Sequence, residues 1–223
     1  MTAVHPDPLQ LALLALLWAL YLALHSVLAS LPCKAFVAQR WPRGFAWYRL
    51  AFNVIALAAL LPPIWLMQEL HGPLLLEWSG AWGWLADGLA VSAVIGVVWT
   101  ARYYDMPAFI GLRRAPAANL ARSSDALFTL SPLHHLVRHP WYFLALIILW
   151  TRNMDAAHLV TALIVNLYFV LGSRLEERKL AIEFGAAYRE YQRLVPGLIP
   201  RPWRILHHAD AQRFMAAPRP GAR

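Results

Sequence analysis

The stretch from Leu9 to Leu31, LQLALLALLWALYLALHSVLASL, contains no formally charged side chain. A helix that crosses about 30 Å of hydrocarbon at about 1.5 Å per residue needs about 20 apolar residues, and this stretch supplies them. It begins after Pro6 and Pro8, and Pro32 is expected to stop it. The stretch is longer than the apolar region of an ordinary signal peptide, and no basic segment precedes it. A membrane-spanning helix is therefore favoured over a signal peptide.

The composition of the whole chain agrees with a membrane protein. The chain is 60% hydrophobic and 14% charged and contains 11 tryptophans, whereas an ordinary soluble domain is about 45–50% apolar and about 25% charged. A disordered chain would be poor in aliphatic and aromatic residues, and a disulfide scaffold would need more than the single Cys33. We therefore expect an integral membrane protein in the lipid bilayer, with no nucleic-acid partner and no evident protein partner.

Further apolar stretches predict the remaining spans. We expect long spans over Trp47–Leu70 and Trp82–Tyr104, and shorter ones over Trp141–Trp150 and Ala157–Gly172, joined by a tight turn. Ser131 suits a helix N-cap and Pro132 the first helical position, so the first short arm should start there and kink at Pro140. The predicted fold class is an all-α integral membrane protein with about five transmembrane helices, the last two forming a short helical hairpin.

The positive charges alternate between the segments that connect these spans. Successive segments carry zero, four, zero, five, one and ten Lys and Arg residues, the last ten from Arg174 onward. Cytoplasmic segments of membrane proteins are enriched in Lys and Arg. This alternation predicts an N-terminus outside the membrane and a C-terminus in the cytoplasm.

The first polar feature is Arg138-His139-Pro140-x-Tyr142, at the entrance to the first short arm. The guanidinium of an arginine there can bind a carboxylate through two parallel hydrogen bonds. The alternative is an arginine whose charged head reaches the membrane interface. His135 and His139 are four residues apart, but no third ligand follows at helical spacing, so we predict no metal site.

Two more features follow the last span. Glu176 and Glu177 are adjacent carboxylates, although a solvated helix face is an equal alternative, since Glu176 can pair with Lys179. The stretch from Phe184 to Pro196 predicts an amphipathic helix, which by default would lie on the membrane surface. The basic segment 201–223 is expected to lie on anionic lipid or to be disordered.

Taken in order, these motifs resemble one superfamily of membrane enzymes. The order is Arg-His-Pro-x-Tyr, a pair of hydrophobic segments, Glu-Glu-x-x-Leu, Phe-Gly-x-x-Tyr-x-x-Tyr and Val-Pro-x-x-x-Pro. It is similar to the isoprenylcysteine carboxyl methyltransferases, with the related phospholipid and bacterial methanethiol S-methyltransferases, from about Arg102 to Pro200. The resemblance implies S-adenosylmethionine as cofactor and divides the chain into a three-helix membrane region (1–104), a methyltransferase core with the cofactor site (105–200) and a basic cytoplasmic tail (201–223).

The resemblance also implies roles for individual residues. Residues matched to cofactor binding are Arg138, His139, Tyr142, Glu176 and Glu177, together with Tyr188, Tyr191 and Arg193 on a helix that closes the pocket. The chain departs from the family at Pro132-Leu133-His134, where many members have Gly-Pro-Tyr. It departs again at Leu144, where many members have a glycine close to the cofactor.

The amino-terminal half resembles the small-thiol branch of this superfamily. The matching residues are His25-Ser26, Lys34, Tyr48-Arg49-Leu50 and Asn53, then Asp105, Phe109, Gly111-Leu112-Arg113 and Trp150–Met154. A thiol has a pKa of about 8.5 and benefits from a nearby base or cation. The candidates for this catalytic role are His25, Asp105 and His139, and the sequence does not choose among them. The alternative for His25 and Asn53 is hydrogen bonding between helices.

The expected function is methyl transfer from S-adenosylmethionine to a small thiol or to a lipophilic thiol or carboxylate that enters from the bilayer. The alternatives are a prenyl-cysteine carboxyl or phospholipid methyltransferase, or a non-catalytic scaffold or channel that keeps the fold. Leu144 in the glycine position is the best support for the non-catalytic alternative. We expect a multi-pass protein of a bacterial inner membrane with its active site facing the cytoplasm.

Overall fold

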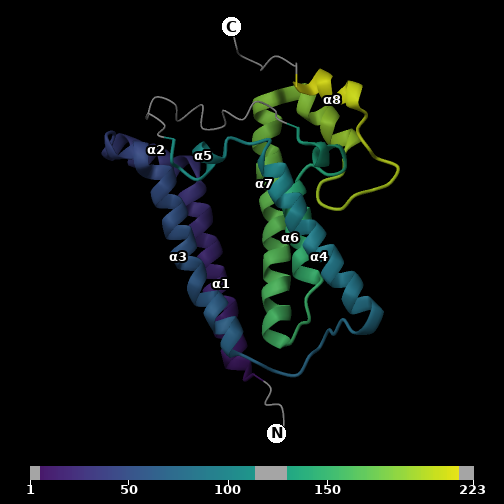
Figure 1. Ribbon diagram of the computed structural model, residues 1–223. Helices are drawn as coiled ribbons and strands as arrows, with labels where there is room; N and C mark the ends of the chain where they lie inside the picture. The colour runs from purple at the N-terminus through teal and green to yellow at the C-terminus, as the bar shows by residue number, and fades with distance from the viewer. Residues whose placement is uncertain (1–5, 114–129, 216–223) are drawn as a thin grey trace. The chain divides into compact units, whose positions relative to one another are not determined.

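The structure, a computed structural model, describes residues 6–113 and 130–215 (Figure 1). Within these ranges the regular structure is helical, and strand pairing is limited to an isolated bridge between Leu76 and Met154. The prediction of an all-α protein is confirmed. Residues 114–129 of the predicted core and residues 216–223 of the predicted tail lie outside the described residues.

Three of the long helices coincide with predicted spans, and the fourth begins where the span Ala157–Gly172 was predicted but continues to Leu194. The helices are α1 (Pro8–Ala29), α2 (Leu31–Arg40), η1 (Gly44–Trp47), α3 (Tyr48–Glu69), α4 (Gly80–Ala101), α5 (Met106–Phe109), η3 (Pro132–His135), α6 (Pro140–Trp150), α7 (Ala156–Leu194) and α8 (His208–Met215). Among the described residues, α1, α3, α4 and α7 are long and apolar enough to cross a membrane, and α6 is a shorter apolar helix. The chain is therefore an integral membrane protein.

Local sequence explains where the first helix begins and ends. The Asp7 carboxylate accepts a hydrogen bond from the Leu9 N–H, and the Gln10 side chain accepts one from the Asp7 N–H, which forms a capping box. The helix ends at Ala29, and Ser30 then caps α2, with Pro32 in its first turn. Pro32 therefore belongs to the start of the next helix, where a missing N–H costs nothing.

The chain forms two compact units that are interleaved along the sequence. The first contains residues 1–77, 105–125 and 153–164, and the second contains residues 78–104, 126–152 and 165–223. Helix α7 therefore contributes its start to the first unit and the rest to the second.

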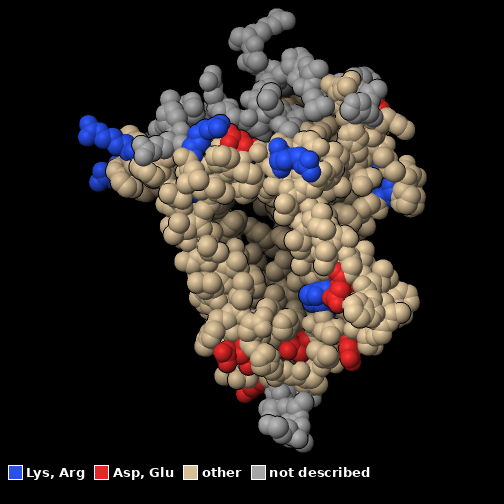
Figure 2. Space-filling view, viewed as in Figure 1, with Lys and Arg blue, Asp and Glu red and all other residues tan. Residues whose placement is uncertain are grey.

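In the first unit α1 packs against α3 (Figure 1). The Trp18 indole N–H donates to the Thr161 hydroxyl at 2.9 Å, which ties α1 to the start of α7. Gly111 adopts φ +87°, and a Cβ there would lie 2.4 Å from the backbone nitrogen of Leu50, so the chain needs glycine at this close approach. Figure 2 shows Lys and Arg near α2, whereas the flank of α1 and α3 between its two ends is uncharged. Such a flank suits hydrocarbon.

In the second unit α4 packs against α6. A Cβ on Gly96 of α4 would lie 3.2 Å from both terminal methyl groups of Leu144, so the leucine fills the space that the glycine leaves. The Trp141 indole N–H donates to the Thr100 hydroxyl at 2.9 Å across the same interface. In the predicted hairpin, the Tyr142 ring of α6 stacks on Phe169 of α7 with centroids 4.7 Å apart.

The prediction that one arm runs from Ser131 through a kink at Pro140 is wrong. Ser131 does cap a helix, but that helix is the single turn η3. Helix α6 starts separately, with Pro140 as its first residue. Proline favours the first position of a helix, because its φ angle suits the helix and its missing N–H has no partner to lose there.

Two features shape the end of the second unit. Gly185 interrupts α7 with φ 58° and ψ −127°, a conformation that is open to glycine, so the chain changes direction there. Residues after 201 were expected to lie on anionic lipid or to be disordered, and the helix α8 (His208–Met215) contradicts disorder for that part. Leu206 and Ala211 are buried in one apolar cluster with Tyr188, Tyr191 and other residues, because these side chains remove apolar surface from water.

Candidate functional site

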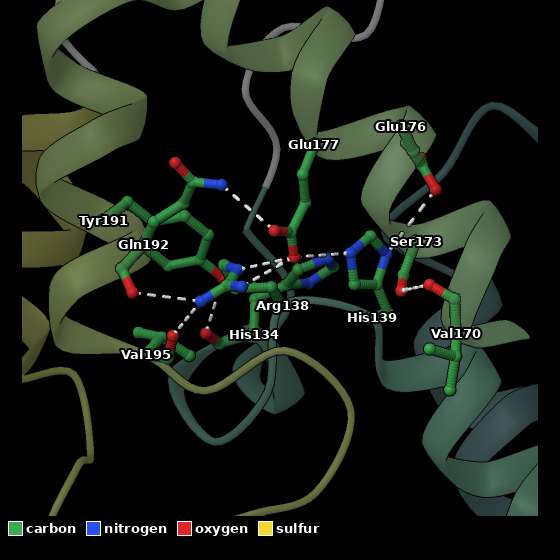
Figure 3. A network of polar contacts seen from close by, with 10 residues as sticks. All are labelled: His134, Arg138, His139, Val170, Ser173, Glu176, Glu177, Tyr191, Gln192 and Val195. Atoms are coloured by element: carbon green, nitrogen blue, oxygen red, sulfur yellow. Dashed lines mark hydrogen bonds and ion pairs between the residues drawn. The ribbon is translucent and has the colours of Figure 1, made fainter.

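The polar residues predicted to bind the cofactor gather in the second unit. Arg138 and His139 lie in the bend before α6, and Glu176 and Glu177 lie on α7 beyond its apolar part (Figure 3). The helix that follows the break at Gly185 returns Gln192 toward them. Three segments that are far apart in the sequence therefore form one cluster.

Arg138 is held on several sides. Its Nε and Nη2 donate to Glu177 Oε1 at 2.8 and 2.7 Å, and its Nη1 donates to the backbone carbonyls of Gln192, at 3.0 Å, and of Val195. Its side chain is 12% exposed. Its backbone N–H also donates to the Pro196 carbonyl at 2.9 Å. The arginine thus fixes the turn after α7 to the start of α6.

His139 lies between the two carboxylates (Figure 3). Its Nε2 is 3.0 Å from Glu177 Oε1, and its Nδ1 is 3.5 Å from Glu176 Oε2. Burial alone would lower the pKa of His139, but its contacts with Glu176 and Glu177 outweigh burial and raise that pKa. An imidazolium that donates on both sides suits this arrangement.

The two glutamates differ in their surroundings. The side chain of Glu177 is 15% exposed and that of Glu176 is 51% exposed. Burial alone would raise the pKa of Glu177, but the hydrogen bonds from His139 and Arg138 lower it to about 2. Glu177 is therefore an internal, ionised partner, and Glu176 is accessible to a ligand.

Gln192 is a member of the cluster that sequence reasoning missed. Its side-chain N–H donates to Glu177 Oε2 at 3.0 Å, while its carbonyl accepts from Arg138. The one available signal was its place beside Tyr191 in the Tyr-x-x-Tyr motif. The Val195 carbonyl carries no side-chain signal at all, because any residue provides a carbonyl.

The predicted aromatic residues pack next to the cluster. Tyr142 has two parallel neighbouring rings, His139 at 5.4 Å and Phe169 at 4.7 Å. Tyr188 and Tyr191 are each 1% exposed, and the Tyr191 hydroxyl donates to the His134 carbonyl at 2.8 Å.

Two of the residues considered from the sequence lie apart from the cluster. The Arg193 side chain is 80% exposed and lies 3.8 Å from Glu190, so the structure does not bring it to Glu177. His135 belongs to η3, and its Nδ1 contacts the Leu206 carbonyl at 2.9 Å. It does not share a helix with His139, contrary to the spacing argument.

The other catalytic candidates lie in the first unit. Asp105 accepts a hydrogen bond from the Ala108 N–H at 3.2 Å and pairs with Arg113, so it caps α5. The His25 ring lies between α1 and α3, 5.1 Å from the Phe52 ring. Asn53 donates to the Phe109 carbonyl at 3.1 Å.

An open pocket of about 310 Å³ lies against the cluster. Its lining consists of Arg174, Glu177, Arg178, Ala181 and Gln192. All but one of these residues are polar or charged. Small-molecule sites in proteins range from about 300 to 1,000 Å³, so the pocket is at the lower end of that range.

The chain is similar to several curated proteins over most of its length. It is 32% identical over 196 residues to methanethiol S-methyltransferase 2 of Bradyrhizobium diazoefficiens, a match that covers 83% of this chain and 71% of that protein. It is also 32% identical over 207 residues to the methanethiol S-methyltransferase of Pseudomonas deceptionensis, which covers 86% and 74%. No family model and no solved structure matches the chain. With this identity over most of both chains, the protein belongs to the methanethiol S-methyltransferase family.

Proposed function

We propose that the protein transfers a methyl group from S-adenosylmethionine to the sulfur of a small thiol, of the kind named for its relatives. The observation that carries the proposal is the cluster of Arg138, His139, Glu176 and Glu177. It brings together the motif residues to which the family resemblance assigns the cofactor. The relatives do not favour a prenyl-cysteine or phospholipid acceptor, nor a scaffold without activity.

The residues present fit this methyl donor. The donor has an ammonium group and ribose hydroxyls, and the half-exposed Glu176 can accept hydrogen bonds from either. Glu177 Oε2 accepts a hydrogen bond from Gln192, a carboxylate oxygen can accept a second one, and both residues line the pocket. The sulfonium of the donor supplies an already activated methyl group. The protein then has to align the two reactants and exclude water.

In this proposal Arg138 positions other groups of the site and does not contact the cofactor itself. The family resemblance assigns it to the cofactor's amino-acid end, but its donors already reach Glu177 and two backbone carbonyls. We infer that it positions Glu177 and the turn at Val195. Tyr188 and Tyr191 then hold the helix after Gly185 in place, because both are buried in the apolar cluster.

The acceptor has to lose a proton. In the transfer, the thiol sulfur forms a bond to the methyl carbon while the carbon–sulfonium bond breaks, and the thiol proton passes to a base. The products are a methyl sulfide and the demethylated donor. His25, Asp105 and His139 remain the proposed bases or positioning groups. Asp105 is already engaged with Arg113, and His139 with the two glutamates.

We further propose that the protein lies in a bacterial inner membrane with this site facing the cytoplasm. The sources of the relatives support a bacterial membrane. The ten Lys and Arg residues from Arg174 onward support a cytoplasmic position for the segment that carries Glu176 and Glu177. S-adenosylmethionine would then reach the pocket from the cytoplasm.

The test is calorimetric binding of S-adenosylmethionine to detergent-purified protein, followed by gas chromatography of the product from methanethiol. We expect saturable binding and formation of dimethyl sulfide. Glu176→Gln should weaken both, whereas Asp87→Asn, which removes an exposed acid paired with Arg152, should change neither. Well-folded wild-type protein that neither binds the donor nor forms the sulfide would disprove the proposed function.

A further inference from the structure

The pocket beside the cluster has a distinct distribution of charge. Arg174, Glu177, Arg178 and Ala181 line it from one face of α7, because residues three and four apart lie together on a helix. Gln192 lines it from the helix after the break at Gly185. The wall on α7 therefore presents two guanidinium groups and one carboxylate to the same space.

The carboxylate of this pocket is already neutralised. Glu177 Oε1 accepts from Arg138 and contacts His139, and its Oε2 accepts from Gln192. In the part of the chain that the structure describes, neither the Arg174 nor the Arg178 side chain forms a hydrogen bond or an ion pair. The pocket consequently has an excess of positive charge and suits an anionic group.

The other arginine of the site is not available for an anion. Arg138 is 12% exposed, and its Nε, Nη1 and Nη2 all donate within the protein. A carboxylate that replaced Glu177 there would have to break the contacts that hold the cluster together. A ligand carboxylate therefore needs a different cation.

We propose that Arg174 and Arg178 bind the carboxylate of the methyl donor's amino-acid end. This inference rests on the proposed function and adds the residues that recognise one end of the donor. Guanidinium groups bind carboxylates through short, charge-assisted hydrogen bonds, often in pairs. The donor's ammonium group then lies on the Glu177 and Gln192 side of the pocket, where Glu177 Oε2 can accept from it.

A lipid phosphate offers the same anionic chemistry, since Arg174 follows closely on the apolar part of α7. The polar wall of the pocket argues for the donor instead. A purely anionic headgroup such as phosphatidylglycerol gains nothing from a carboxylate such as Glu177, whereas a zwitterionic amino-acid group uses both signs of charge.

The experiment compares two ligands that differ by one group. Binding of S-adenosylmethionine and of decarboxylated S-adenosylmethionine is measured by calorimetry on wild type, Arg174→Gln and Arg178→Gln. A charge-assisted hydrogen bond is worth about tenfold in affinity or more. We expect each variant to lose about tenfold for the full donor and less than about twofold for the decarboxylated one. Arg152→Gln, an exposed arginine paired with Asp87, is the matched control and should leave both affinities unchanged.

Other outcomes would overturn the inference. An equal loss for both ligands would assign the arginines to the stability of the pocket, which thermal unfolding of the same variants checks. Unchanged donor binding, together with weaker binding of the variants to phosphatidylglycerol vesicles, would assign them to lipid. Wild-type protein that binds neither ligand would overturn the proposed function itself, and this inference with it.

Discussion

Glu176 and Glu177 are neighbours in sequence but point in different directions from α7. Successive residues of a helix are separated by about a quarter turn or more around its axis, since a turn contains about 3.6 residues. Glu177 therefore reaches Arg138 and Gln192, while Glu176 contacts Nδ1 of His139. Glu177 holds the cluster together and also lines the pocket, whereas Glu176 is half exposed and bears less on the fold of the site.

Substitution of each glutamate should separate these roles. Glu177→Gln leaves Arg138 without a charged partner, so it should lower the free energy of unfolding by about 2 kcal/mol. Glu176→Gln should change that free energy by less than about 0.5 kcal/mol, as at ordinary exposed positions, but should weaken donor binding. Denaturation in detergent and calorimetry measure the two effects. Equal destabilisation by both variants would contradict the assignment.

The same cluster predicts how stability depends on pH. The lowered pKa of Glu177, about 2 against an ordinary value of 4.5, contributes stability above pH 4.5 that is lost as the pH falls toward 2. The raised pKa of His139 contributes stability below 6.5 that is lost as the pH rises through its folded value. The melting temperature should therefore be highest between about pH 4.5 and 6.5. Glu177→Gln should flatten the acid side of this profile and His139→Gln the alkaline side. A pH profile of the melting temperature that is unchanged in both variants would contradict the assignment of the two sides to Glu177 and His139.

The residues of the cluster could be predicted to different extents. Arg138, His139 and Glu177 were predictable, because charged side chains at the ends of apolar segments need partners and form a recognisable order. The exposed position of Arg193 was not, since its neighbour on the chain, Gln192, points inward instead. The carbonyl contacts of Arg138 depend on the path of the backbone after Leu194. The side chains in the sequence do not reveal that path.

At the scale of elements, the interface of α4 and α6 explains the unusual Leu144. The family often has glycine at this position, yet here the leucine is 6% exposed and lies against Gly96 of α4. A small residue on one helix and a large one on the other allow the two to pack closely. The small residue that the resemblance leads one to expect at position 144 of α6 is instead Gly96 on α4.

Substitutions at this interface should show that it is tightly packed. Leu144→Ala leaves a cavity and should lower the free energy of unfolding by about 2–5 kcal/mol. Gly96→Val should also destabilise, since its Cβ would already be 3.2 Å from the leucine methyl groups. Gly88→Ala on the same helix, where a Cβ meets nothing within 4 Å, is the control. Thermal unfolding measures all three, and a stable Gly96→Val variant would argue against the packing.

The positions of the helices were predictable where a long apolar stretch determines them. α1, α3 and α4 lie where the apolar stretches placed them, because only a helix satisfies its own backbone in hydrocarbon. The start of α6 was missed because proline both kinks helices and begins them, and the sequence around Pro140 allows either. The break at Gly185 and the fold of residues 206–214 depend on contacts between distant residues, such as the hydrogen bond from the Leu206 N–H to the His135 carbonyl.

At the scale of the whole molecule, the cations predict an orientation that can be measured. Alkaline phosphatase is active only outside the cytoplasm, so a fusion within residues 71–79 should be active and one after Pro200 inactive. Ten Lys and Arg residues from Arg174 onward, against none between Leu70 and Gly80, are the reason. Fusions to a fluorescent protein that folds only in the cytoplasm should give the opposite pattern. An active phosphatase after Pro200 would reverse the proposed orientation.

The bonds from Arg138 to the carbonyls of Gln192 and Val195 also set an order of events during synthesis. These partners follow Arg138 by 54 and 57 residues, which a ribosome takes about three to ten seconds to add. Glu177, the charged partner of Arg138, is made earlier, 39 residues after it, but until Gln192 and Val195 follow, the guanidinium lacks the two carbonyls that fix its place. We expect α6 to take its final place only after the helix beyond Gly185 has been made, so a ribosome stalled earlier should leave this segment sensitive to protease.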